Sequence, residues 1–580
     1  METSKKIRNT WLENQQLDQQ TRDELLSLTD DDEIYDRFYK ELEFGTGGLR
    51  GVLGAGTNRM NRYTVRKATQ GFADYINRHY TKNPAVAIAY DSRINSELFA
   101  YEAAGVLLAN GIKAYIYSEL MPTPALSFAV RQYGCAAGIM VTASHNPAKY
   151  NGYKVYNEEG CQMTLDAAAE VFSLIQKVDI FKDVKLGTEK PTPIPKEVAD
   201  KFLEAVAAES TGISCENLSL VYTPLNGAGN KPVRQILEKI GMGHVTLVKE
   251  QENPDGNFTT CPYPNPEKEE ALHLGLALCN EMNQEGDGPD LLLATDPDCD
   301  RVGVAVKQLV RSTPLEKGGR EGVSFKSQYQ LLTGNEVGVL LLDFICQRRQ
   351  EAANGIGKAK PMPKNPIAIK TIVSSKMADA VAAQYGVEMR DVLTGFKFIG
   401  EQIGILEKKG EEARYIFGFE ESYGYLSGAY VRDKDAVNGS MLICQMASFY
   451  KMEGKTLADR LEELYQTYGY YQNDLMDFAF EGAPGMEKMA QIMADFRKNP
   501  PAEMIGKQVV KSVDYSLPTD LPKADVVEYV LEDGSSFMVR PSGTEPKLKI
   551  YLSAKGQTGE ESEQIIENLK IQLKERIHAI

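Results

Sequence analysis

Histidine and paired cysteines are the residue types that this chain lacks most clearly. Five of its 580 residues are His, so a mechanism that depends on several histidines is not expected. The eight Cys are scattered and none forms a C-x-x-C pair, which excludes the usual patterns of a zinc site or a disulfide framework. We expect reduced core thiols in a cytoplasmic protein.

Long apolar runs and excess positive charge are also missing. No stretch approaches the ~18 apolar residues of a membrane helix, and residues 1–20 lack the apolar segment of a signal peptide. The net charge of −16 argues against a general affinity for nucleic acid or for an anionic membrane surface. We therefore expect no nucleic-acid or membrane partner, and an anionic substrate would require a locally basic pocket. No obligate protein partner is evident from the sequence.

The remaining composition is typical of a globular protein, with 42% hydrophobic and 25% charged residues. Domains run to roughly 100–200 residues, so the length predicts about three to five of them. We expect four, at residues 1–200, 201–325, 326–455 and 456–580.

Strand-like and helix-like segments alternate in three rounds, which predicts α/β units with mostly parallel sheets. The first round has strands at 85–90, 113–117 and 135–142 and a helix at 96–110. The second has strands at 218–222, 244–249, 291–294 and 302–306 and a helix at 231–240. The third has helices at 337–349, 376–385 and 435–451 and strands at 367–373 and 415–419.

The two ends of the chain differ from these rounds. Residues 1–40 predict polar helix, with Leu25, Leu26, Tyr35 and Phe38 as packing positions. The last hundred residues predict an α+β module, with strands at 526–531, 536–540 and 547–553 and a helix at 560–576. Asp533-Gly534 is a hairpin turn signal between the first two of these strands. The charged segment 311–327 predicts a surface loop.

The first chemical motif is a serine in a turn. The run Thr142-Ala143-Ser144-His145-Asn146-Pro147 follows an apolar strand. A serine hydroxyl is a weak nucleophile that needs activation or prior phosphorylation, and small neighbours would present it at the mouth of a cleft. The serine-hydrolase pattern G-x-S-x-G is absent, because Thr142 and Asn146 occupy its glycine positions. A turn in which Ser144 only bonds to backbone is the alternative.

The second motif is an acidic loop, Asp296-Pro297-Asp298-Cys299-Asp300-Arg301, between two predicted strands. Three carboxylates at alternating positions can converge on a hard cation, and without one their mutual repulsion is costly. An EF-hand is excluded, because its sixth and twelfth positions are Arg301 and Lys307. Mg²⁺ fits better than Ca²⁺. The alternative is a solvated acidic loop.

Two further loops carry polar groups. Glu420 and Ser422 occupy positions i and i+2 at the end of a predicted strand, so an extended segment would point both side chains the same way. Together they could accept and donate hydrogen bonds to adjacent hydroxyls, such as those of a sugar. The run Arg540-Pro541-Ser542-Gly543-Thr544 offers a guanidinium, two hydroxyls and backbone N–H groups to a phosphate. The alternatives are a charged loop and a bulged hairpin loop.

In this order and at these separations, the four motifs resemble the α-D-phosphohexomutase superfamily, from about Phe44 to the end of the chain. The sequence is most similar to the group that contains phosphoglucomutases and phosphopentomutases. The resemblance implies an α/β fold: three similar α/β domains with mixed sheets and a C-terminal α+β domain, arranged around a central cleft.

The resemblance also assigns roles to residues. It implies that Ser144 is the phosphoserine and that Mg²⁺ is held by Ser144, Asp296, Asp298 and Asp300. The candidate catalytic residues are Ser144, His145, Lys154 and Arg50. The candidate substrate-binding residues are Glu420, Ser422, Lys397, Arg301, Arg540, Ser542, Gly543 and Thr544.

The implied substrate is a phosphosugar, and the implied activity is the interconversion of glucose 1-phosphate and glucose 6-phosphate through phospho-Ser144, with glucose 1,6-bisphosphate as intermediate and activator. The run Phe419-Glu420-Glu421-Ser422 is closer to the E-E-S form of phosphoglucomutases than to the E-M-S-G-H form of phosphomanno/glucomutases, which favours glucose. Phosphopentomutase or phosphomannomutase activity is the alternative. A phosphatase and a catalytically silent sugar-phosphate-binding protein are the rivals from other classes.

Overall fold

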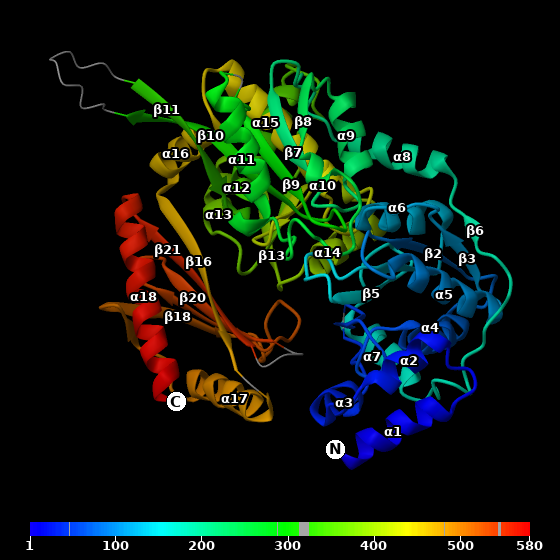
Figure 1. Cartoon of the computed structure of the whole chain (residues 1–580). Coiled ribbons are helices and arrows are strands. Elements are labelled where there is room, and N and C mark those ends of the chain that lie inside the picture. The colour runs from blue at the N-terminus through cyan, green and yellow to red at the C-terminus, as the bar shows by residue number, and fades with distance from the viewer. Residues whose placement is uncertain (46, 287, 313–323, 481, 543–546) are drawn as a thin grey trace. The chain divides into compact units, whose positions relative to one another are not determined.

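The structure of this protein is a computed structural model that describes residues 1–45, 47–286, 288–312, 324–480, 482–542 and 547–580 (Figure 1). The chain forms two compact units. Unit 1 comprises Met1–Leu332, Gly400–Ala413 and Gly424–Phe449. Unit 2 comprises Thr333–Ile399, Arg414–Tyr423 and Tyr450–Ile580.

Unit 1 begins with three short helices, where the sequence predicts polar helix. They are α1 (Glu2–Glu13), α2 (Gln19–Ser27) and α3 (Asp31–Phe38). Leu25 and Phe38 are buried as predicted, in a small core around Trp11. The predicted burial of Leu26 and Tyr35 is wrong, because both side chains are exposed. Leu26 follows Leu25 by one residue and therefore points about a quarter turn away from the core.

The first sheet of unit 1 has six strands in the order β1-β5-β4-β2-β3-β6. They are β1 (Leu49–Val52), β2 (Ala85–Tyr90), β3 (Lys113–Ile116), β4 (Ala137–Val141), β5 (Tyr150–Tyr156) and β6 (Thr192–Pro193). The neighbouring helices are α4 (Arg62–His79), α5 (Ser96–Ala109), α6 (Thr123–Tyr133) and α7 (Leu165–Ile175). Strands β4, β2, β3 and β6 are parallel, whereas β5 is antiparallel to both of its neighbours, so the sheet is mixed.

Strand β5 is not among the predicted strands. Its residues Asn151, Gly152 and Lys154 have low strand propensity, yet they are buried between β4 and β1. The packing of the sheet therefore overrides local preference at this position. The strand matters for the site described below, because it carries Lys154.

The second sheet of unit 1 has five strands in the order β11-β10-β9-β7-β8. They are β7 (Ser219–Thr223), β8 (His244–Leu247), β9 (Leu291–Thr295), β10 (Val302–Ser312) and β11 (Ser324–Leu332). Its helices are α8 (Lys196–Ala207), α9 (Asn230–Lys239), α10 (Lys249–Glu252) and α11 (Glu269–Gln284). The predicted loop at 311–327 is wrong at both ends, which belong to β10 and β11; residues 313–323 lie outside the described residues.

Unit 1 also contains β15 (Gly424–Leu426) and most of α15 (Ala436–Met452), and α14 (Phe396–Lys408) runs from unit 2 into unit 1.

Unit 2 has a parallel sheet in the order β13-β12-β14. Its elements are α12 (Gly334–Ala353), β12 (Ile367–Thr371), α13 (Met377–Gln384), β13 (Glu388–Val392), the 3₁₀ helix η1 (Glu412–Arg414) and β14 (Tyr415–Glu420).

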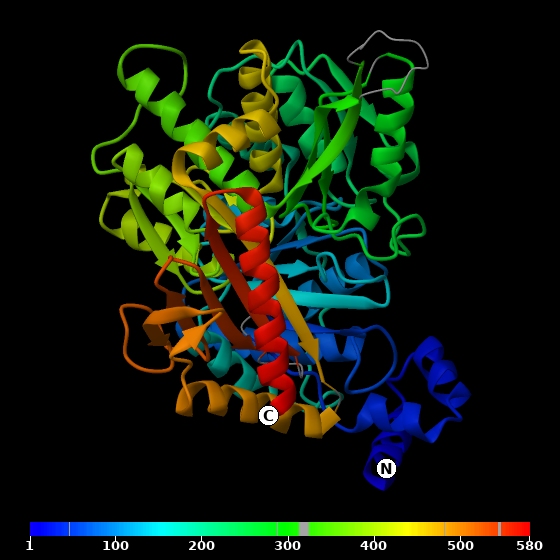
Figure 2. The ribbon, with the colours of Figure 1, turned by 90° about the vertical axis from the view of Figure 1, so that its left-hand side faces the viewer.

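The C-terminal part of unit 2 is an antiparallel sheet in the order β16-β21-β20-β19-β18-β17. Its strands are β16 (Tyr470–Ala479), β17 (Glu503–Met504), β18 (Lys507–Asp514), β19 (Val527–Leu531), β20 (Ser536–Pro541) and β21 (Lys547–Gly556). The helices are α16 (Leu457–Tyr468), α17 (Gly482–Lys498) and α18 (Gly559–Ala579). Figure 2 shows α18 running along this sheet, where it contacts β16 and β21. The predicted turn is confirmed, since Gly534 has φ 86° between β19 and β20.

Three α/β sheets followed by an α+β module confirm the predicted fold class. Among the described helices, none combines the length and the apolar character needed to cross a membrane.

Candidate active site

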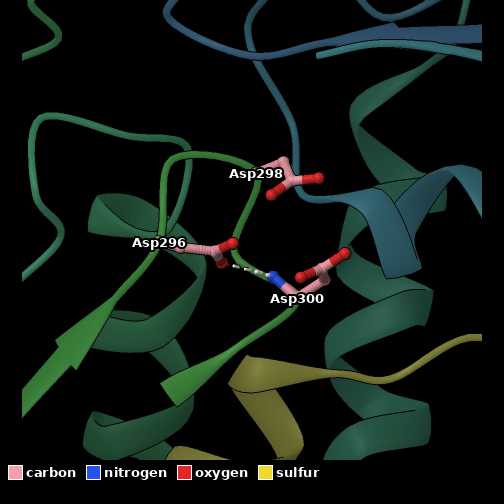
Figure 3. Close-up of side chains that lie close together, drawn as sticks. All are labelled: Asp296, Asp298 and Asp300. Carbon is pink, nitrogen blue, oxygen red and sulfur yellow. Dashed lines mark hydrogen bonds between the residues drawn. The ribbon is translucent and has the colours of Figure 1, made fainter. Parts of the chain in front are cut away.

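The loop between β9 and β10 gathers three carboxylates. Asp296, Asp298 and Asp300 are at most 1% exposed, and one oxygen of each lies within 4.8 Å of the other two. Figure 3 shows the three side chains converging, with the Asp300 N–H donating to Asp296 Oδ1 at 3.1 Å. Antiparallel pairing of β9 with β10 brings the two ends of the loop together. The loop therefore holds the carboxylates in one buried cluster.

Ser144 lies beside this cluster, although 152 positions separate it from Asp296 along the chain. The Ser144 hydroxyl donates to Asp296 Oδ2 at 2.8 Å. The structure thus brings together the serine and the acidic loop, the juxtaposition that the sequence predicts. Ser144 itself is 3% exposed, so its side chain is buried beside the carboxylates.

A buried arginine that the sequence analysis does not single out holds the serine loop. Arg93 Nε donates to the Ser144 carbonyl at 3.2 Å, and Nη1 donates to the carbonyls of Pro147 and Tyr150, both at 3.1 Å. Its Nη2 also donates to the Asn146 carbonyl. One guanidinium therefore fixes the backbone at Ser144 and in the segment that follows it, and Ser144 itself has a left-handed conformation with φ 52°.

Asp91 anchors the other side of the same loop. Its carboxylate accepts a hydrogen bond from the Thr142 hydroxyl, whose oxygen in turn accepts from the Ser144 N–H at 2.8 Å. Asp91 also lies 3.5 Å from Arg93 Nε. Asp91 and Arg93 directly follow β2 in a mostly parallel sheet, and polar side chains just past such strand ends commonly build sites. That signal could have identified both residues.

Two lysines face the acidic cluster. Lys154 Nζ lies 2.7 Å from Asp298 Oδ2 and 3.5 Å from Asp300 Oδ2, and Lys434 Nζ lies 2.8 Å from Asp300 Oδ2. Lys154 is a predicted site residue and Lys434 is not; the charged run Arg432–Asp435 was the available signal. Arg301 Nε also lies 3.8 Å from Asp300 Oδ1, so three buried carboxylates lie among three cationic side chains.

The pKa shifts in the cluster follow from burial and charge. Burial opposes the charge on Lys154, but attraction to Asp298 and Asp300 outweighs it and raises the Lys154 pKa. Burial, together with Asp298 and Asp300, raises the pKa of Asp296 well above its usual value. Burial acts the same way on Asp298, yet Lys154 overcomes it and lowers the Asp298 pKa. The cluster therefore favours a further cation near Asp296.

The remaining predicted residues of unit 1 are His145, Arg50 and Arg301. His145 Nδ1 lies 3.2 Å from the Ser144 hydroxyl. Burial and then the positive charges of Arg301 and Arg50 lower the His145 pKa well below its usual value, so the imidazole is neutral at pH 7. Arg50 Nη1 donates to Asn146 Oδ1 at 3.4 Å. Arg301 pairs with Glu267 at 2.7 Å.

Unit 2 contains the other candidate substrate-binding residues. Glu420 ends β14 and is 4% exposed. The prediction that Glu420 and Ser422 point the same way is wrong, because residues 421–423 form a turn rather than an extended segment. The sequence analysis gave no role to Glu421, whose Oε2 accepts a hydrogen bond from the Thr371 hydroxyl at 3.0 Å.

Tyr551 connects two of the predicted loops within unit 2. Arg540 Nη1 donates to the Tyr551 hydroxyl oxygen at 3.5 Å. Burial and the nearby charges of Glu421 and Glu420 raise the Tyr551 pKa, while Arg540 opposes this shift. Glu420, Glu421 and Arg540 are therefore all within electrostatic reach of one buried hydroxyl, although sequence alone gave no reason to select Tyr551.

The other predicted residues of unit 2 are placed only in part. The Ser542 N–H donates to the Lys547 carbonyl at 2.7 Å, whereas Gly543 and Thr544 lie outside the described residues. Lys397 is in α14, with its Nζ 4.9 Å from the centroid of the Phe398 ring.

Comparisons with known proteins agree with these motifs. Four domain models described as phosphoglucomutase/phosphomannomutase match the chain in succession. Alpha/beta/alpha domains I, II and III match residues 41–180, 200–309 and 333–468, and the C-terminal domain matches residues 481–569. A phosphoglucomutase of Staphylococcus aureus strain MRSA252 is 36% identical over 535 residues, which cover 89% of this chain and 90% of that protein. The phosphoglucomutase of strain RF122 is 37% identical, covering 90% and 91%.

Solved structures share the fold at lower sequence identity. Parafusin, a phosphoglucomutase of Paramecium in its open form, has a TM-score of 0.66 at 18% identity and covers 93% of this chain and 96% of its own. A phosphoglucomutase/phosphomannomutase family protein of Burkholderia thailandensis has a TM-score of 0.64 at 17% identity, with coverage of 91% and 96%. These solved structures share the fold, and the four domain models and the curated relatives show that the chain belongs to the phosphoglucomutase/phosphomannomutase family.

Proposed function

We propose that this protein is a phosphoglucomutase that interconverts glucose 1-phosphate and glucose 6-phosphate through a phosphorylated Ser144. The observation that carries the proposal is the 2.8 Å hydrogen bond between the Ser144 hydroxyl and Asp296 of the buried acidic cluster. The curated relatives named phosphoglucomutase support the choice of glucose. We also propose that the protein is located in the cytoplasm.

The acidic loop fits a magnesium ion. Three carboxylate oxygens converge, and Asp298 Oδ1 is buried without a hydrogen-bond partner among the described residues, which is costly unless a cation binds there. Asp296, Asp298 and Asp300 would hold Mg²⁺ with an oxygen of phospho-Ser144. When bound, Mg²⁺ offsets negative charge on the transferring phosphoryl group.

The protein groups then have distinct tasks. Arg93 and Asp91 fix the Ser144 backbone, so that the phosphoryl group is held in one orientation. The ammonium form of Lys154 limits repulsion between the carboxylates and the phosphoryl oxygens. The neutral imidazole of His145, 3.2 Å from Ser144 Oγ, is the proposed proton acceptor and donor.

In the forward half-reaction, the bond between phosphorus and Ser144 Oγ breaks and a bond forms to the free hydroxyl oxygen of the sugar phosphate. The proton of that hydroxyl ends on Ser144 Oγ, giving glucose 1,6-bisphosphate, which also activates unphosphorylated enzyme. In the second half-reaction the other phosphoryl group returns to Ser144. We propose that Arg540 and Ser542 hold the phosphate that is not reacting and that Glu420 contacts sugar hydroxyls.

A coupled assay tests this function. Glucose, mannose, ribose and glucosamine 1-phosphates are compared with Mg²⁺ and a trace of the matching bisphosphate, and inorganic phosphate is measured in parallel. We expect glucose 1-phosphate to be preferred with little phosphate release. Preference for ribose or mannose would instead indicate a phosphopentomutase or phosphomannomutase, and stoichiometric phosphate release a phosphatase.

A further inference from the structure

Unit 1 contains a cavity of about 330 Å³ whose lining includes none of the candidate site residues. Four segments of the chain form its walls: residues 119–121, one face of α8, residues 227–235 around the start of α9, and residues 253–254. On α8 the lining positions 196, 199, 200 and 203 follow helical spacing. The cavity therefore lies where the first sheet's loops, the connecting helix and the second sheet's loops meet.

The floor of the cavity is apolar. Met121, Phe202, Leu203 and Ala228 line it and are at most 6% exposed. Small-molecule sites combine such a floor with a few polar groups and occupy about 300–1,000 Å³. A volume near the lower limit suits a bicyclic ring rather than a nucleotide.

The charged side chains at the mouth of the cavity indicate which polar group a ligand would carry at that end. Lys231 pairs with Glu119, and Lys196 and Asp200 are the other charged groups of the lining. These two positive and two negative side chains balance one another, so the mouth has no excess of charge that would favour a ligand with several charges of one sign. The N-terminal end of α9 also lines the mouth and favours a negative charge over a positive one. A single carboxylate fits these conditions.

Two walls of the cavity touch the acidic loop directly. The Ala228 N–H donates to the Pro297 carbonyl at 2.8 Å, and the Thr123 N–H, two residues after Met121, donates to the Asp298 carbonyl at 2.9 Å. The Thr123 hydroxyl also donates to Asp298 Oδ2 at 3.0 Å. Gly227 packs so closely against Pro297 of the acidic loop that a Cβ atom added to Gly227 would lie 2.4 Å from the Pro297 Cα. These contacts join both walls of the cavity to the loop that carries the carboxylates.

We propose that this cavity binds a small aromatic carboxylic acid and that its occupancy changes the affinity of the acidic loop for Mg²⁺, the second part resting on the proposed function. The ring lies on Phe202, Leu203 and Met121, and the carboxylate lies at the mouth near Lys196 and the start of α9.

Calorimetric titration of the full-length protein with 1-naphthoate tests the binding. We expect one saturable site, and we expect Ala199→Trp, which fills the cavity from α8, to weaken binding about tenfold or more, equivalent to about 1.4 kcal/mol. Ala208→Trp is the matched control, because Ala208 is exposed at the end of the same helix; it should bind as the wild type does. Gln235→Trp fills the cavity from α9 and replaces Ala199→Trp if that variant does not fold.

The outcomes separate the parts of the proposal. Absence of saturable binding, or unchanged binding in both filled variants, would overturn the site. Equal binding of the neutral 1-naphthalenemethanol would overturn the carboxylate. Titration of Mg²⁺ with and without saturating 1-naphthoate should show a change of about fivefold or more, and an unchanged affinity would overturn the coupling. These titrations measure binding and not turnover, so they are independent of the coupled assay described above. If the protein bound 1-naphthoate but isomerised no sugar phosphate in that assay, only the proposed function would be contradicted.

Discussion

Units 1 and 2 both hold candidate active-site residues, but they hold them differently. In unit 1, Ser144 and the three aspartates are almost fully buried and are fixed by partners from several strands and loops. In unit 2, Glu420 is also buried, but Ser422 and Arg540 are half-buried on a turn and near a strand end. Groups that take part in making and breaking bonds must be held in a fixed orientation, whereas residues that bind a substrate must be accessible to it. We propose on this basis that unit 1 carries out phosphoryl transfer and that unit 2 recognises the sugar and the phosphate that is not reacting.

The largest expected effect is in the acidic loop. Asp298→Asn removes a ligand charge and leaves Lys154 without its nearest partner, so kcat should fall about 10³-fold, near the upper range for one preorganised electrostatic contact. Calorimetry should show that Mg²⁺ binding is lost while thermal unfolding remains cooperative. Asp520→Asn, at an exposed position of unit 2, is the control. Wild-type Mg²⁺ affinity in Asp298→Asn would refute the metal assignment.

Arg93→Met should give the next largest effect. Loss of the guanidinium frees the carbonyls of the serine loop, and misplacing a reacting group by about 1 Å costs about 10² in rate. We expect kcat to fall by that factor with KM changed little, and mass spectrometry to show less phosphorylation of Ser144. Arg93→Lys should not restore activity, because one ammonium cannot replace the planar fork. Lower thermal stability with normal Ser144 phosphorylation would mean that Arg93 is only structural.

Arg540→Ala tests the contrasting role of unit 2. A hydrogen bond to a charged group contributes about 1.5–3 kcal/mol, so KM should rise about 10- to 100-fold while kcat changes less. Arg540→Lys should recover part of the affinity, since it keeps the charge without the bidentate geometry. A fall in kcat at unchanged KM would place Arg540 in the chemical step and remove the distinction between the units.

Glu420→Gln should have the smallest effect of the four. It replaces a charge-assisted hydrogen bond with a neutral one, so kcat/KM for glucose 1-phosphate should fall about tenfold. The ratio of glucose 1-phosphate to ribose 1-phosphate activity is the informative measurement, because Glu420 is proposed to contact sugar hydroxyls. An unchanged kcat/KM with both sugars would exclude that contact.

Much of the fold was predictable because apolar runs mark buried strands. Strand β2, for example, lies where the sequence predicts it, at Ala85–Tyr90. Strand β5 was not predictable, since its polar and glycine residues are held by the neighbouring strands. Within the site, Ser144 and the aspartates stand in recognisable runs. Arg93 and Lys434 have only weaker local signals, a strand end and a charged run, because their roles arise from contacts with segments distant in sequence.

The most direct test of the account follows the phosphoryl group itself. The wild-type protein is incubated with glucose 1,6-bisphosphate and Mg²⁺, freed of ligand, analysed by intact and peptide mass spectrometry, and then mixed with glucose 1-phosphate. We predict one phosphoryl group on Ser144 that disappears from the protein and is recovered in glucose bisphosphate. A phosphoryl group on another residue, or its recovery as inorganic phosphate, would contradict the account.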